Sequence, residues 1–176
     1  MRTPRIAALV AVAALVLTGC TPDATAQQYL EGTDKGYITS DTRWKEWAPA
    51  ERVEATPFEG VLDTGDAVSS DDLVGKVSVV NFWYTNCGPC RVEAPDLQAV
   101  WEEYEDDGDV AFLGVNLEDS APSAQAFADE YGITYPSVID EGDGAAKFAF
   151  AQLVPLTAVP VTLVLDREGR AAARIL

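Results

Sequence analysis

Two cysteines with two residues between them are the side chains of this sequence best suited to redox chemistry. Cys87, Gly88, Pro89 and Cys90 follow the apolar run 77–83 and open a stretch with helical spacing of apolar residues. A thiol at the start of a helix lies beside unpaired backbone N–H groups, which favour the thiolate. We therefore predict that Cys87 is the nucleophile and that Cys90 resolves the mixed disulfide. Gly88 permits close approach of a substrate, and Pro89 fixes the chain entering the helix.

Other roles for the cysteine pair fit the sequence poorly. Zinc would need two further thiolate or imidazole ligands, whereas the chain has no histidine and one other cysteine, Cys20. A c-type haem site needs histidine after the second cysteine, and Arg91 stands there. A structural disulfide across two residues removes little entropy from the unfolded chain. We expect a redox-active disulfide without a metal or another cofactor.

Composition restricts the partners of the protein. The 176 residues are 48% hydrophobic, enough for one domain with a proper core. The formal net charge is -17, and an acidic surface repels phosphate backbones and anionic lipid headgroups. We expect no nucleic-acid binding and no polybasic membrane docking.

The N-terminus has the layout of an export signal. Arg2 and Arg5 precede an apolar stretch over 6–17, which at about 12 residues is too short to span a bilayer. The following Leu-Thr-Gly-Cys resembles a bacterial lipobox, whose cysteine becomes the acylated N-terminus. We predict a signal peptide over 1–19, lipidation of Cys20 and a position on the outer face of the cytoplasmic membrane. The alternative is a plain secretory signal or an uncleaved short anchor, with Cys20 a stray thiol.

The rest of the chain divides into a tether over 20–55 and a domain over 56–176. The tether is polar and lacks apolar periodicity, but we expect Trp44 and Trp47 in it to pack on the domain. In the domain, strand and helix patterns alternate, which indicates an α/β fold with a mixed central sheet flanked by helices. The expected elements are a hairpin over 58–68, strands over 77–83, 110–117, 135–139, 161–165 and 170–176, and helices after Cys90, over 122–131 and over 145–151.

The segment 80–95, with Cys87-Gly88-Pro89-Cys90 at its centre, resembles the active-site segment of membrane-anchored TlpA/ResA-type thioredoxins. The likeness covers roughly 57–176. It implies a thioredoxin-like fold with an N-terminal β-hairpin and one inserted α/β element, and an extracytoplasmic thiol-disulfide oxidoreductase. It also implies a reducing role, including reduction of apocytochrome c, a membrane thiol reductant of the CcdA/DsbD type, and a monomer.

The resemblance also suggests roles for residues around the cysteines. Glu93, three residues after Cys90, matches a carboxylate near the family's active site, whereas Asn81 stands where cytosolic thioredoxins carry a buried acid. We expect Glu93 to carry protons to and from Cys90; the alternative is an exposed helix carboxylate. Val159-Pro160 resembles the cis-proline loop that pairs with substrate backbone, although Pro160 could instead start a strand in the trans form.

Trp83 and Asn86 complete the expected substrate-binding residues, with Gly88, Pro89 and the Val159-Pro160 loop. The sequence departs from the family pattern in two ways. Asn86 replaces the tryptophan usually found before the first cysteine, and the sequence ends at Leu176, where the family continues into a helix that covers one sheet face. We therefore expect that this helix is missing or that something else covers the face.

Two other functions remain open on the sequence. A disulfide oxidant would use the same residues at a higher potential, although the Gly-Pro pair between the cysteines resembles reducing thioredoxins. A non-catalytic binding module or metallochaperone would use the fold for recognition, but copper delivery of the related type typically adds a histidine, which this chain lacks.

Overall fold

A six-stranded mixed sheet forms the frame of the structure, a computed structural model that describes residues 44–155 and 157–176. The strand order is β1-β8-β7-β4-β5-β6. Strands β4, β5 and β6 are parallel, whereas β7 is antiparallel to β4, and β8 is antiparallel to both β7 and β1. The strands are β1 (Trp44–Glu46), β4 (Val77–Trp83), β5 (Val110–Asn116), β6 (Ser137–Ile139), β7 (Val161–Leu165) and β8 (Ala171–Ile175).

Strand β4 lies in the middle of the sheet and leads directly to the cysteines. Its almost continuous apolar sequence is typical of a strand covered on both faces, and Val80 and Phe82 are buried among core side chains. In the register, Phe82 pairs with Val115 of β5 and with Val161 of β7. The C-terminal end of β4 is therefore fixed from both sides.

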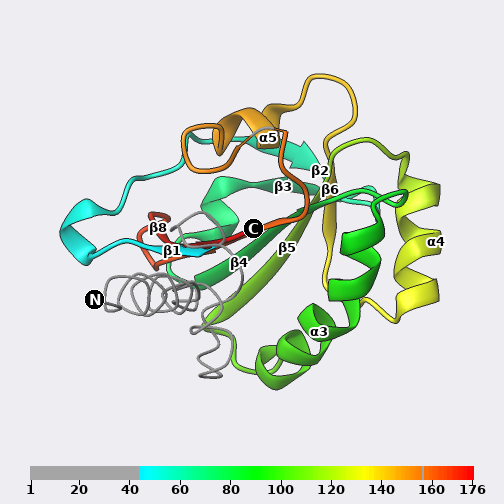
Figure 1. Ribbon diagram of the computed structural model, residues 1–176, viewed down its shortest axis with the longest axis horizontal. Helices are drawn as coiled ribbons and strands as arrows, with labels where there is room; N and C mark the ends of the chain where they lie inside the picture. The colour runs from blue at the N-terminus through cyan, green and yellow to red at the C-terminus, as the bar shows by residue number, and fades with distance from the viewer. Residues whose placement is uncertain (1–43, 156) are drawn as a thin grey trace, which may run out of the picture. The chain divides into compact units, whose positions relative to one another are not determined.

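Helices cover both faces of the sheet (Figure 1). The helices α3 (Gly88–Tyr104) and α4 (Ala121–Tyr131) pack on one face, where Ala94 and Phe127 share a core cluster with Trp83. The short helix α5 (Ala145–Ala149) precedes Phe150, which packs edge-on against Phe82 on the other face, with ring centroids 5.5 Å apart. Helix α3 continues through Pro95, and α4 ends at Gly132, whose φ of 70° is readily adopted by glycine.

A hairpin outside the main sheet precedes the central strand. It consists of β2 (Glu59–Val61) and β3 (Ala67–Ser69), and the 3-10 helix η2 (Ser70–Leu73) follows it. The hairpin is tied to β6, because Leu62 forms a bridge with Val138 and the N–H of Asp63 donates to the carbonyl of Ser137 at 2.8 Å. The hairpin, the mixed sheet and the α4–β6 insertion confirm the predicted fold class and element order.

The domain that the structure describes includes residues before 56, where the sequence placed its boundary. Strand β1 pairs with β8, and the 3-10 helix η1 (Pro49–Glu51) follows it. Trp47 is packed with 9% exposure, as expected, whereas Trp44 is 60% exposed, contrary to expectation. A strand of three exposed residues leaves no hydrophobic pattern in the sequence. The predicted signal peptide, Cys20 and most of the predicted tether lie outside the described residues.

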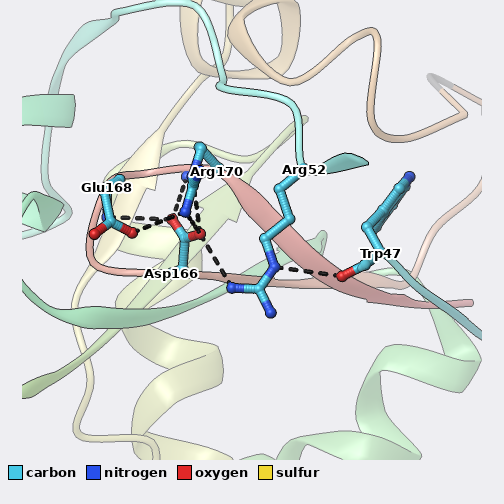
Figure 2. Close-up of polar contacts among 5 residues, drawn as sticks. All are labelled: Trp47, Arg52, Asp166, Glu168 and Arg170. Atoms are coloured by element: carbon cyan, nitrogen blue, oxygen red, sulfur yellow. Dashed lines mark hydrogen bonds and ion pairs between the residues drawn. The ribbon is translucent and has the colours of Figure 1, made fainter. Parts of the chain in front are cut away.

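An ion-pair cluster joins this N-terminal segment to the turn between β7 and β8 (Figure 2). The carboxylate of Asp166, 10% exposed, accepts from Arg52 at 3.1 Å and from Arg170, while Arg52 also donates to the carbonyl of Trp47. Glu168 binds Arg170 from the exposed side. Burial alone would raise the pKa of Asp166, but the hydrogen bonds from Arg170 and Arg52 outweigh it and lower the pKa to about 2.

No helix of the described residues has both the length and the apolar character needed to cross a bilayer.

Candidate active site

Cys87 and Cys90 form a disulfide at the N-terminal end of α3, with their Cα atoms 5.2 Å apart. Cys87 is the N-cap residue, and its Sγ accepts the backbone N–H of Cys90 at 3.1 Å. This N–H is one of those that a helix start leaves without a helical partner. The same donor is available to a Cys87 thiolate, which agrees with the expected nucleophile. Each cysteine exposes 2% of its surface in this oxidised state.

Glu93 lies one turn further along α3 and is half-buried, so it is not the fully exposed carboxylate considered as an alternative. The amide nitrogen of Asn81 donates to its Oε1 at 2.8 Å and to Oγ1 of Thr162 at 3.0 Å. Burial raises the pKa of Glu93, and the hydrogen bond from Asn81 offsets part of this rise. A carboxyl group with a raised pKa can both hold and release a proton nearer to neutral pH.

A small cavity of about 10 Å³ lies behind Cys90, between α3, α4 and the sheet. Its polar lining comes from Asn81, Tyr135 and Ser137, and its size suits roughly one water molecule. Burial and the nearby charge of Glu93 both raise the pKa of Tyr135, which keeps its phenol protonated. The resolving sulfur therefore borders a mostly apolar cavity whose few polar groups include Asn81, the hydrogen-bond partner of Glu93.

The loop before β7 lies against the cysteines. The Val159–Pro160 peptide bond is cis, which confirms the predicted isomer. The side chain of Val159 packs on the cluster that contains Trp83, Cys87 and Cys90. The structure therefore brings together the cysteine pair and the cis-proline loop, which are far apart in the sequence.

The residues expected to bind substrate lie at different depths. Asn86, Gly88 and Pro89 are exposed around the disulfide. Trp83, in contrast, is 5% exposed; it packs on Phe127 with ring centroids 4.5 Å apart, and its indole N–H donates to Ser137. The structure places Trp83 beneath the cysteines, where it supports the site from the interior.

One group of residues near the cysteines was not identified from the sequence. The carboxylate of Asp119, in the β5–α4 loop, accepts the N–H of Thr85 at 2.6 Å, the hydroxyl of Thr85 at 2.7 Å and the amide of Asn116 at 2.9 Å. Burial acts to raise the pKa of Asp119, but these hydrogen bonds outweigh it and lower the pKa. On its other side, Thr85 accepts from Nε of Arg91 at 3.0 Å. The only sequence signal was a polar Asn-x-x-Asp at the end of a predicted strand.

Known proteins resemble this chain in sequence and in fold. The chain is 30% identical to the thiol-disulfide oxidoreductase ResA of Halalkalibacterium halodurans over 60% of its own length, and spans 56% of that relative. It is 34% identical to the thioredoxin-like protein YneN of Bacillus subtilis, over 71% of each chain. A crystal structure of a DsbF homologue from Corynebacterium diphtheriae superposes with a TM-score of 0.68 at 34% identity, covering 79% of this chain and 87% of that one.

The matches to these thiol-disulfide oxidoreductases and thioredoxin-like proteins bear out the predicted thioredoxin-like fold. The model of the AhpC/TSA family matches residues 52–174, which include every described residue of the cysteine site. The chain belongs to the AhpC/TSA family.

Proposed function

We propose that this protein is an extracytoplasmic thiol-disulfide oxidoreductase that works as a protein disulfide reductase. The observation that carries the proposal is the Cys87–Cys90 disulfide at the start of α3, next to the cis-Pro160 loop. The similarity of the chain to the thiol-disulfide oxidoreductase ResA supports the same chemistry. The redox-active group is the disulfide itself.

The reaction exchanges one disulfide for another. The Cys87 thiolate attacks a substrate disulfide, forms a mixed disulfide and releases one substrate thiolate, which takes up a proton. The Cys90 thiolate then attacks Sγ of Cys87 and releases the second substrate thiolate. The substrate gains two electrons, and the protein is left with the Cys87–Cys90 disulfide that the structure contains.

Glu93 carries the proton of the second step. Cys90 must lose its proton before it attacks, and it is buried against the α3–α4 interface. Glu93 contacts Asn81, which lines the cavity next to Cys90, so a proton has a short path between them. Asn86, Gly88, Pro89 and the Val159–Pro160 loop form the surface on which the substrate segment lies, and Trp83 supports it from below.

The reducing direction is supported by the Gly-Pro pair between the cysteines, which resembles that of reducing thioredoxins. In that direction the substrates are protein disulfides such as that of apocytochrome c, and a membrane thiol reductant of the CcdA/DsbD type restores the dithiol. The protein acts as a monomer.

The site of action is the outer face of the cytoplasmic membrane. Residues 1–19 are a cleaved signal peptide, Cys20 carries the lipid, and the residues up to β1 form the tether. Mass spectrometry of the protein from its native membrane tests the lipidation: an acylated N-terminal Cys20 supports it, and an unmodified Cys20 contradicts it. A Cys20→Ala variant should be lost from the membrane fraction.

Reduction of insulin disulfides by the full chain, with dithiothreitol as the electron source, tests the activity. We expect catalysis by the parent and none by Cys87→Ser, whereas Cys20→Ser serves as the matched thiol control and keeps full activity. Equal activity in the parent and Cys87→Ser would contradict the proposal. The reduction potential then tests the direction: a value near the roughly -270 mV of thioredoxin supports a reductant, and one near the roughly -120 mV of DsbA supports an oxidant.

A further inference from the structure

Arg91 occupies an unfavourable place for a cation. It lies in the first turn of α3, where the helix dipole is positive, and its side chain is exposed. Among the described residues it has no carboxylate within 4.0 Å, as is also true of Arg174, whereas Arg52, Arg167 and Arg170 form ion pairs. In a chain with a net charge of -17, a cation left unpaired at this end of a helix calls for a compensating interaction.

One side-chain hydrogen bond holds Arg91 beside the backbone that leads into Cys87, and the helical bond of its N–H fixes its backbone. Its Nε donates to the carbonyl of Thr85, and its backbone N–H donates to the carbonyl of Cys87 at 3.2 Å. Thr85 is fixed from the opposite side, because both its N–H and its hydroxyl donate to Asp119. Asp119 is held in turn by the buried amide of Asn116.

We propose that Arg91 stabilises the thiolate of Cys87, and that Asp119 and Thr85 are positioning residues that hold Arg91 in place. The inference deepens the proposed function and rests on it. A cation close to a thiolate lowers the cost of the charged form, and the disulfide described here leaves the sulfur neutral. In the reduced protein, the negative charge of the Cys87 thiolate therefore offsets the unfavourable position of Arg91 at the start of the helix.

Of the described segments around the cysteines, two carry charged residues. Arg91 and Glu93 come from α3, and Glu118 and Asp119 come from the β5–α4 loop. The segment 155–160 before β7 and the first turn of α4 contain no charged residue. Arg91 is thus the single positive charge among the groups that bear on Cys87 from these elements.

The direction in which Asp119→Ala shifts the pKa of Cys87 distinguishes this arrangement from a direct effect of the charge of Asp119. Removing the negative charge of Asp119 should, by its charge alone, stabilise a nearby thiolate and lower the pKa of Cys87. If Asp119 acts by holding Arg91, its removal releases the guanidinium and raises that pKa instead. A double-mutant cycle of Asp119→Ala and Arg91→Gln isolates the coupling.

The experiment titrates Cys87 in the full chain with Cys20→Ser and Cys90→Ala as the background, following thiolate absorbance and the rate of alkylation by iodoacetamide against pH. We expect Arg91→Gln to raise the pKa of Cys87 by roughly half a unit or more, which reduces the thiolate about threefold below the pKa. Arg91→Lys should restore most of the loss. Asp119→Ala should raise the pKa in the parent and not in the Arg91→Gln protein.

An unchanged pKa in Arg91→Gln overturns the role of Arg91, and a lowered pKa in Asp119→Ala overturns the positioning role. Thr85→Val, which removes one hydrogen bond, gives a milder test in the same direction if Asp119→Ala does not fold. Arg167→Gln, at an exposed arginine of the β7–β8 turn, is the matched control and should leave the pKa of Cys87 unchanged. Because the titration needs no protein substrate, its failure is distinguishable from a failure of insulin reduction.

Discussion

The side-chain amide of Asn81 donates a hydrogen bond to the carboxylate of Glu93, with 2.8 Å between Nδ2 and Oε1. This contact joins the middle of the central strand to the helix that carries both cysteines. An amide does not titrate, so within this pair only Glu93 can take up or release a proton. The acid-base function at this site is therefore located on the helix instead of the strand.

Replacing Glu93 with glutamine should slow the step in which Cys90 attacks the mixed disulfide. Glutamine keeps an oxygen for the amide of Asn81 but cannot carry the proton. We expect a loss of roughly a hundredfold at neutral pH, at the lower end of general acid-base contributions. Single-turnover quenched-flow measurements check this rate. Asp96→Asn, at an exposed carboxylate of the same helix, should keep the parental rate; equal losses in both variants would contradict the role of Glu93.

The same substitution should change stability in a pH-dependent way. Burial raises the pKa of Glu93 above its ordinary value of 4.5, so the folded protein binds this proton more tightly than the unfolded chain does. Stability from this group is then greatest below pH 4.5 and declines as pH rises through the folded-state pKa. Glu93→Gln should therefore be more stable than the parent at pH 7 and similar to it at low pH. Urea unfolding at both pH values measures the difference, and a less stable variant at pH 7 would be the contrary result.

Removal of the resolving thiol should trap the substrate. In Cys90→Ala, the Cys87 thiolate can still form the mixed disulfide, but the protein has no second sulfur to release it. We expect a covalent complex on non-reducing gels that dithiothreitol dissociates. Cys87→Ala should form none; if it traps as much as Cys90→Ala, the assignment of the nucleophile is wrong.

Asp166→Asn should destabilise the domain, because it removes the charge that joins Arg52 of the N-terminal segment to Arg170 (Figure 2). The expected loss is on the order of 2 kcal/mol, as for other hydrogen bonds to charged groups. Since the pKa of Asp166 is lowered to about 2 from 3.8, its contribution is present above pH 3.8 and disappears as pH falls through about 2. The free energies of unfolding of the parent and the variant should therefore converge in acid.

Glu168→Gln, which removes an exposed partner of Arg170, should change stability by less than about 1 kcal/mol. Thermal unfolding as a function of pH compares the three proteins.

Gly114→Ala should disturb the support beneath the cysteines. A Cβ at this position of β5 would lie 2.8 Å from the indole nitrogen of Trp83 and would also overlap the hydroxyl of Ser137. We expect a loss of about 1–3 kcal/mol in the free energy of unfolding and a change in tryptophan fluorescence. Gly88→Ala meets no atom within 4 Å and should leave stability unaltered. An undisturbed Gly114→Ala protein would show that Trp83 can shift freely.

The sequence predicted the parts of this molecule that rest on local patterns. Strand β4, the helix that begins after Cys87 and the cis-Pro160 loop follow from apolar runs, spacing and a recognisable segment. The contact between Asp119 and Thr85 did not follow, because it joins residues 34 positions apart and depends on how two parallel strands end side by side. The depth of Trp83 was also missed, since an aromatic residue at a strand end gives no sign of which face it points to.

The pairing of β1 with β8 has a consequence for the order in which the chain can assemble. Trp44 is registered against Ile175, and β8 lies between β1 and the rest of the sheet (Figure 1). The first described strand therefore has no partner until residues 171–175 are available. A chain made from its N-terminus must therefore keep this segment open until almost the whole domain has been synthesised, and pairing segments so far apart has a large cost in loop-closure entropy. Closure of this edge of the sheet then reports a domain whose described strands are all present.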